Sequence, residues 1–142
     1  MQVENILQSK GAKVHTVVAT AKIAEAVQLL SSNNIGAIVV VDANDAVVGI
    51  LSERDIVRRM KNDSATIMLA TVASCMTSDP VTCGMQSTVN DLMQIMTERR
   101  IRHVPVLDDG RLVGLISIGD VVKRKILEAE QEAAALRDYI AS

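Results

Sequence analysis

The sequence predicts an α/β (α+β) fold of two pseudo-symmetric β-α-β-β-α repeats that pack through their sheets. The first observation is an internal repeat, because GILSERDIVRR (49–59) and GLISIGDVVKR (114–124) share Gly, Ser, Asp, Val and Arg at five equivalent positions. The second is an upstream match between residues 22–42 and 88–108, in which apolar positions coincide. The third is size. One copy of about 50–60 residues is small for an independent core, so two copies are expected to bury their apolar sheet faces together.

Each copy presents the same elements in the same order. Apolar residues at three- and four-residue spacing predict amphipathic helices over 24–33 and 90–99. Runs rich in Val and Ile predict buried strands at 37–41 and 103–107, and each is followed by a polar turn. Second strands at 47–51 and 112–116 then lead into short helices after Ser52 and Ser117.

Two further segments lie outside this repeated pattern. The link between the copies, residues 61–80, is predicted to contain a helical stretch and then a turn at Ser78, Asp79 and Pro80. The C-terminal segment 126–142 is rich in helix formers, and its apolar residues recur at helical spacing. This stripe packs either on the body of the protein or against its counterpart in a dimer; it consists of Ile126, Ala129, Ala133, Leu136 and Ile140.

The composition is that of a globular protein rather than a disordered one, with 49% apolar and 23% charged residues. Tyr139 is the only aromatic residue, which disfavours the base-stacking platforms of single-strand nucleic-acid binders. A formal net charge of −2 provides no attraction to a phosphate backbone. The longest apolar run, AIVVV, is far too short to span a membrane, and the N-terminus lacks the apolar block of a signal peptide. We therefore expect a cytoplasmic protein without nucleic-acid or membrane partners.

The sequence offers little support for catalysis. It contains no G-x-S-x-G, P-loop, G-x-G-x-x-G or His-Glu-x-x-His motif, and its two His residues have no convincing nucleophile beside them. Cys75 and Cys83 fit neither a metal-ligand nor a redox spacing and are predicted to be buried, inert thiols. We expect no enzyme, no catalytic cofactor and no metal site, with Mg²⁺ only as a companion of a bound nucleotide.

The repeated Ser-x-x-Asp has two interpretations. Ser52 with Asp55, and Ser117 with Asp120, match a capping box, in which the Ser accepts a hydrogen bond from a free backbone N–H and the carboxylate favours the positive helix end. The functional interpretation adds a ligand at the same corner. A carboxylate there repels phosphate and suits ribose hydroxyls, while the helix N-terminus offers N–H groups to anions.

The segments IGAIVVVD…GILSERDIV and IRHVPVLD…GLISIGDVV resemble the cystathionine-beta-synthase (CBS) domain, here as a tandem pair known as a Bateman module. The resemblance covers roughly residues 10–130. It implies a first CBS domain at 10–66, a second at 75–132 and a helical tail at 133–142. With no other domain-sized segment, the chain looks like a stand-alone pair. CBS pairs commonly form flat homodimers, which favours the dimer interpretation of the C-terminal stripe.

The resemblance also implies a ligand, namely an adenosine nucleotide such as AMP, ADP, ATP or NAD(H). The ribose would be bound by Asp55 and Asp120, with Ser52 and Ser117 beside them. The phosphates would meet cations at the mouth of the cleft, whereas Arg99 and Arg100 are interpreted as a solvated helix end. The remaining candidates are the phosphate ligands Arg54, Arg102 and His103, the adenine walls Ala37, Ile38 and Val104, and the weaker polar contacts Thr16 and Thr82.

The two halves are not equivalent. Glu53 and Arg54 align with Ile118 and Gly119, and Glu53 is expected to make the first site more acidic. The preferred hypothesis is a non-catalytic regulatory module that senses an adenosine nucleotide between the repeats and reports to an unknown effector protein. The alternative is a structural or protein-interaction module that acts through dimerisation without nucleotide, its Ser-x-x-Asp corners serving only as helix caps.

Overall fold

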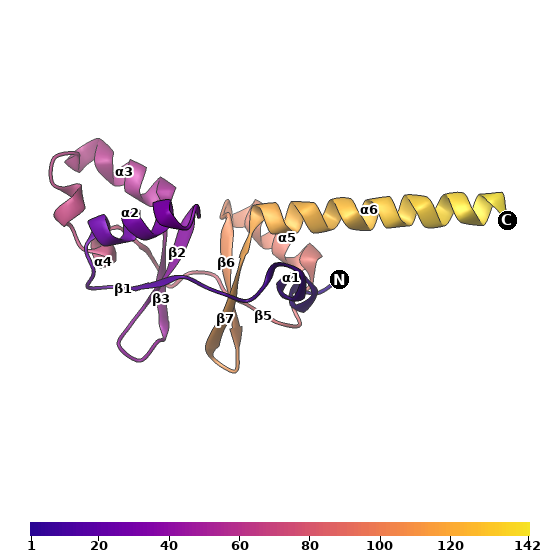
Figure 1. Ribbon diagram of the computed structural model, residues 1–142, viewed down its shortest axis with the longest axis horizontal. Coiled ribbons are helices and arrows are strands. Elements are labelled where there is room, and N and C mark those ends of the chain that lie inside the picture. The colour runs from indigo at the N-terminus through magenta and orange to yellow at the C-terminus, as the bar shows by residue number, and fades with distance from the viewer.

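The computed structural model describes residues 1–142 as two α/β halves whose sheets face each other, with the helices on the outer sides (Figure 1). The sheet of the first half has the strand order β1-β2-β3-β4, and the sheet of the second half has the order β5-β6-β7. In each half the first strand runs parallel to the second, which pairs antiparallel with the third. The strands are β1 (Thr16–Val18), β2 (Ala37–Val41), β3 (Val47–Ser52), β4 (Thr77–Ser78), β5 (Cys83–Gly84), β6 (His103–Asp108) and β7 (Arg111–Ser117).

The helices follow the repeat as well. The predicted helices at 24–33 and 90–99 are α2 and α5, and the helices predicted after Ser52 and Ser117 are α3 and α6, so the α/β prediction is confirmed. Helix α6 is not short as predicted, because it continues without a break for 24 residues to Ala141. The link contains two short helical turns rather than one stretch, and Ser78 belongs to the unpredicted β4, so the predicted turn begins only at Asp79. The helices are α1 (Val3–Lys10), α2 (Ile23–Ser32), α3 (Glu53–Asp63), the 3₁₀ turn η1 (Ile67–Leu69), α4 (Val72–Cys75), α5 (Val89–Arg99) and α6 (Ile118–Ala141).

Each half has its own apolar core, to which a segment outside the repeat contributes. Ile67 of η1 and Val72 of α4 are buried in the core of the first half. Helix α1 was not predicted from the sequence, and it completes the core of the second half with Val3, Ile6 and Leu7. The chain therefore begins on the second half and crosses to the first at β1 (Figure 1).

The repeated glycines leave room for these extra segments. A Cβ atom at Gly49 would lie 2.5 Å from Met76 Sδ and 2.9 Å from the Thr77 carbonyl oxygen, and one at Gly114 would lie 2.6 Å from Leu7 Cδ2. Both distances are shorter than a normal van der Waals contact. Gly49 in β3 and Gly114 in β7 therefore allow α4–β4 and α1 to pack closely on their sheets.

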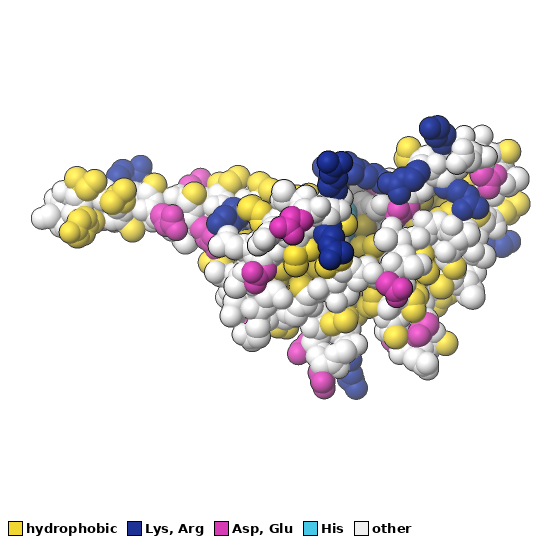
Figure 2. Space-filling model, turned by 180° about the vertical axis from the view of Figure 1, so that it is seen from behind, with side chains coloured by type: hydrophobic (Ala, Val, Ile, Leu, Met, Phe, Trp, Pro, Cys, Tyr) yellow, Lys and Arg dark blue, Asp and Glu magenta, His cyan; other side chains and the backbone are white.

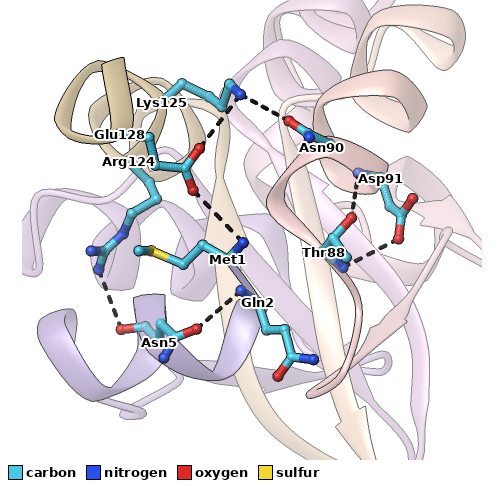
Figure 3. A network of polar contacts seen from close by, with 9 residues as sticks. All are labelled: Met1, Gln2, Asn5, Thr88, Asn90, Asp91, Arg124, Lys125 and Glu128. Atoms are coloured by element: carbon cyan, nitrogen blue, oxygen red, sulfur yellow. Dashed lines mark hydrogen bonds and ion pairs between the residues drawn. The ribbon is translucent and has the colours of Figure 1, made fainter. Parts of the chain in front are cut away.

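Polar contacts hold the N-terminal helix to the second half (Figure 3). The Val89 N–H donates to the Met1 carbonyl oxygen at 2.8 Å, and the Met1 amino group lies 3.8 Å from Glu128 Oε1. The Arg124 guanidinium donates to the Asn5 carbonyl oxygen at 3.3 Å. These contacts come from α5 and α6, so α1 is fastened on two sides.

Helix α6 extends well beyond the body of the protein (Figure 1). Along the predicted apolar stripe, Ile126 is 53% exposed, Leu136 60% and Ile140 75%. The stripe therefore does not pack on the body of its own chain, which was one of its two interpretations. No helix of the protein combines the length and apolarity that crossing a membrane requires.

Candidate functional site

Both Ser-x-x-Asp corners form the predicted capping boxes. Ser52 Oγ accepts from the Asp55 N–H at 3.3 Å, and Asp55 Oδ2 accepts from the Ser52 N–H at 2.9 Å. The corresponding distances at Ser117 and Asp120 are 3.2 and 2.8 Å. A third box, between Thr88 and Asp91 at the start of α5, shows that this arrangement serves structure in its own right.

A cleft of about 510 Å³ lies between the two halves. Its volume is in the range typical of small-molecule sites. Five predicted site residues line it: Ser52, Arg54, Asp55, Arg102 and His103. The other lining residues are Gly36, Ile50, Glu53, Arg58, Thr77, Asp79, Pro80, Val81, Arg99, Arg100 and Ile101.

The halves meet within this cleft around Gly36. A Cβ atom placed there would lie 3.9 Å from both Glu53 Cδ and His103 Cε1. The backbone repeats on each side, because the Glu53 N–H donates to the Gly36 carbonyl oxygen at 3.0 Å and the Ile118 N–H donates to the Arg102 carbonyl oxygen at 2.8 Å. The first half therefore supplies the Ser-x-x-Asp corner, and the second half supplies the end of α5 and the start of β6.

Asp55 keeps one oxygen available to a ligand. Its Oδ2 atom is occupied by the capping hydrogen bonds from the Ser52 N–H and Oγ. Its Oδ1 atom receives only a long hydrogen bond of 3.4 Å from Thr77 Oγ1 and lies 3.9 Å from the Arg58 Nη1 atom. An acceptor held this weakly in a cleft can take hydrogen bonds from the hydroxyl groups of a bound molecule.

The cleft is rich in positive charge. Five arginines face three carboxylates, and the neutral form of His103 adds nothing to this excess. Figure 2 shows Lys and Arg side chains gathered around the hollow between the halves. The charge favours an anionic ligand. The arginines are Arg54, Arg58, Arg99, Arg100 and Arg102, and the carboxylates are Glu53, Asp55 and Asp79.

His103 is held neutral by its surroundings. Burial lowers the pKa of its imidazole from 6.5, and the charges of Lys10 and Arg102 lower that pKa further, against the opposing effect of Asp120 and Glu53. At neutral pH the ring therefore acts as a hydrogen-bonding group rather than as a cation.

The Ser117–Asp120 corner of the second half forms an ion pair with a lysine of the same chain. Lys10 Nζ donates to Asp120 Oδ2 at 2.7 Å and to the Leu115 carbonyl oxygen at 2.9 Å. Burial raises the pKa of the Asp120 carboxyl, but hydrogen bonds from Lys10 and Ser117 outweigh that effect, so the pKa lies below its ordinary 3.8. Asp120 and Ser117 do not line the cleft that contains Asp55.

Other predicted residues lie away from the cleft. Ala37, Ile38 and Val104 are at most 2% exposed and are not among the lining residues, so their assignment as adenine walls stays a prediction. Thr16 and Thr82 are exposed and outside the lining. Sequence reasoning missed the apolar residues that do line the cleft, which are Ile50, Val81 and Ile101. Alternation along β3 was the available signal for Ile50, which points away from the buried Leu51.

The thiols and the possible metal ligands lie outside this chemistry. Cys75 and Cys83 are both free, and each is half-buried rather than fully buried as predicted. Burial raises the pKa of Cys83 to about 11. A thiol with that pKa is almost fully protonated at neutral pH and a poor nucleophile. No three His, Cys, Asp or Glu side chains gather in an arrangement that could hold a metal ion.

A chain with this geometry has clear relatives. The crystal structure of the CBS-domain containing protein ATU1752 from Agrobacterium tumefaciens is 45% identical, with a TM-score of 0.85 over 88% of this chain and 99% of that one. The CBS domain pair of protein MJ0100, solved in complex with 5′-methylthioadenosine and S-adenosyl-L-methionine, is 26% identical, with a TM-score of 0.80 over 90% and 98%.

A curated relative and a family model agree with these structures. The mitochondrial CBS domain-containing protein CBSX3 of Arabidopsis thaliana is 36% identical over 120 residues, which are 82% of this chain and 58% of that protein. This chain thus spans little more than half the length of that relative. The family model described as the CBS domain matches residues 3–62 and 72–126, so the chain belongs to the CBS domain family as a tandem pair.

Proposed function

We propose that the protein is a non-catalytic regulatory module that binds one adenosine nucleotide (AMP, ADP, ATP or NAD(H)) in the cleft between its two halves. The observation that carries this proposal is the composition of the cleft: the Ser52–Asp55 corner of the first half lies opposite the basic end of α5 and the start of β6. Adenosine compounds bound to the related MJ0100 pair support the choice of ligand class.

Different residues of the cleft bind different parts of the ligand. Asp55 Oδ1, held only by the 3.4 Å hydrogen bond from Thr77, accepts hydrogen bonds from the ribose hydroxyls. Ile50 and Ile101, one from each half, provide apolar surface for the base. The arginines bind the phosphates, and any Mg²⁺ arrives with the nucleotide.

The proposed stoichiometry follows from the difference between the halves. In the second half Lys10 already occupies the carboxylate of Asp120 at 2.7 Å, in a pair that is partly shielded from water. That ammonium group neutralises the carboxylate, and neither Asp120 nor Ser117 lines the cleft. We therefore propose one nucleotide per chain, bound at the Asp55 corner.

The proposed mechanism is linkage. A ligand that touches both halves favours the relative orientation in which Gly36, Glu53 and His103 meet, and an effector protein that binds this orientation is favoured in turn. We further propose that the protein acts in the cytoplasm as a homodimer. The proposed homodimer is supported by the exposed apolar surface on the outer helices, which includes Val57, Ile126 and Leu136.

A structural or protein-interaction module remains the second candidate function. It is favoured by the capping boxes, since Ser52 and Asp55 hold the same helix-capping contacts as Thr88 and Asp91, which lie outside the cleft. The exposed stripe of α6 would then be its working surface.

Thermal unfolding in the presence of AMP, ADP, ATP, NAD, NADH and S-adenosylmethionine separates the two candidates. Because the chain has no Trp whose fluorescence could be followed, unfolding is measured by far-UV circular dichroism. A ligand that binds only the folded state, at 100 times its Kd, adds about 2.7 kcal/mol to the free energy of unfolding. We expect a clear rise in Tm for at least one nucleotide, and unchanged curves at millimolar ligand would favour the interaction module.

The substitution Asp55→Asn tests the site itself, with Asp91→Asn as its matched control. Both remove a carboxylate from a capping box, but only Asp55 lines the cleft. We expect both variants to lose a similar amount of stability and only Asp55→Asn to lose the ligand-dependent rise in Tm. An undiminished rise in Asp55→Asn would show that the ribose assignment is wrong.

A further inference from the structure

Arg100 adopts a left-handed backbone conformation, which is unfavourable for an arginine. It ends α5 in the left-handed region, with φ 54° and ψ 42°, and the next residue, Ile101, donates its N–H to the Met96 carbonyl oxygen at 3.2 Å. The equivalent position of the first half is Asn34, with φ 52°, followed by Ile35 with the same kind of hydrogen bond to Leu30 at 3.0 Å. Both halves thus end the helix with a left-handed residue followed by the six-to-one hydrogen bond of the Schellman motif.

The helix end gives no reason for an arginine. Among residues with a side chain, Asn adopts the left-handed conformation more readily than Arg does, because its short polar side chain makes local hydrogen bonds. The two halves share the same cap geometry, and the first half uses Asn34. No hydrogen bond or ion pair holds the Arg100 side chain within the protein. Arg100 is one of the residues that line the cleft, together with Arg99 and Arg102.

Position in the cleft separates two groups of arginines. Arg54 and Arg58 lie on α3 with Asp55, and Arg58 Nη1 is 3.9 Å from the Asp55 carboxylate. Arg100 and its neighbours come from the opposite half. Arg99, Arg100 and Arg102 form no ion pair within the protein, so their charge is available to phosphates that extend from a ribose held at Asp55.

We propose that Arg100 determines ligand specificity by binding the second or third phosphate of a nucleoside di- or triphosphate, together with Arg99 and Arg102. This inference rests on the proposed function, because it places the ribose at Asp55. The excess of arginines over carboxylates disfavours a cationic adenosine compound such as S-adenosylmethionine. A left-handed arginine therefore lowers the stability of the helix end and adds a phosphate ligand.

Isothermal titration calorimetry of the full chain and of Arg100→Asn, with AMP, ATP and inorganic tripolyphosphate, tests this proposal. A hydrogen bond between charged groups corresponds to a loss of about 10- to 100-fold in affinity when it is removed. We expect that loss for ATP and tripolyphosphate and a change of less than about threefold for AMP. Since Asn suits the left-handed position, we expect Tm to stay the same or rise by about 2–4 °C.

Two variants serve as controls. Arg137→Gln removes the same charge from the exposed end of α6 and should leave all three affinities unchanged. Asn34→Arg places an arginine at the equivalent left-handed position of the first half and should lower Tm without changing ATP binding in the cleft. A drop in Tm for Arg100→Asn would identify a structural role and overturn the proposal.

The three ligands separate failure of this inference from failure of the proposed function. Equal losses of AMP and ATP binding in Arg100→Asn, or no loss of either, overturn the specificity role and leave nucleotide binding intact. Binding of tripolyphosphate but of no nucleotide by the parent protein overturns the proposed function, and its loss in Arg100→Asn then still supports the phosphate role. A parent protein that binds none of the three overturns both.

Discussion

Replacing Lys10 with Met should destabilise the protein by about 1 kcal/mol at pH 7. The Lys10 ammonium donates to Asp120 and to a carbonyl oxygen of β7, and the two charged side chains are 37% and 21% exposed. Hydrogen bonds to charged groups contribute about 1.5–3 kcal/mol, and exposed ion pairs contribute about 0–1 kcal/mol. A partly exposed pair lies between these values. For a chain of this length the loss corresponds to a fall in Tm of about 3–4 °C.

The pH dependence of this loss identifies its cause. Because the pKa of Asp120 is depressed in the folded state, the ion pair stabilises the protein above the ordinary carboxyl pKa, and this contribution disappears as pH falls through the folded value. The difference in stability between the parent and Lys10→Met should therefore be full at pH 7 and shrink below about pH 4.

Urea unfolding followed by circular dichroism at pH 7, 5, 4 and 3 measures this difference, with Lys13→Met as the control. Lys13 is exposed and forms no ion pair, so its substitution should change stability very little at any of these pH values. A loss in Lys10→Met that is the same at pH 7 and pH 3 would refute the ion-pair explanation and indicate lost packing of the lysine stem instead.

Three further predictions concern the packing, the thiols and the long helix. Gly49→Ala should cost about 1–3 kcal/mol in urea unfolding and more than Gly114→Ala, because its Cβ meets the carbonyl oxygen of Thr77 whereas the other meets only a leucine side chain; equal losses would contradict this. Cys83 should react slowly with a thiol reagent at pH 8 and much faster near pH 11, and rapid modification at pH 8 would contradict its burial. Truncation after Glu130 should leave the far-UV spectrum of the body intact and abolish the proposed dimer in sedimentation, which an unchanged dimer would contradict.

The repeat made the fold predictable to a large extent. Two registered copies of a helix followed by two strands defined α2, β2 and β3 and their counterparts within a residue or two. Helix α1 was not predicted, because its partners lie in the second half, far along the sequence. The packing role of its apolar residues becomes clear only from the tertiary structure, in which the Leu7 side chain packs against Gly114. The short strand β4 was not predicted for a similar reason, because its residues form a strand only through their pairing with β3.

The candidate site was predictable in its polar part and less so in its apolar part. Ser52 and Asp55 stand out as a repeated motif, and both line the cleft. The resemblance to the CBS domain implied Ile38 and Val104 as adenine walls, and in the structure each side chain is buried in the core of its own half. The ion pair between Asp120 and Lys10 could not be anticipated either, because it depends on α1 packing on the second half.

The most direct test of the central claim is hydrogen–deuterium exchange of the protein with and without saturating ATP. We expect protection on both sides of one cleft, around Gly36 and the start of α3 in the first half and around residues 99–103 in the second, with no change at the Ser117–Asp120 corner. Protection confined to one half, or centred on Asp120, would contradict a nucleotide that bridges the two repeats at Asp55.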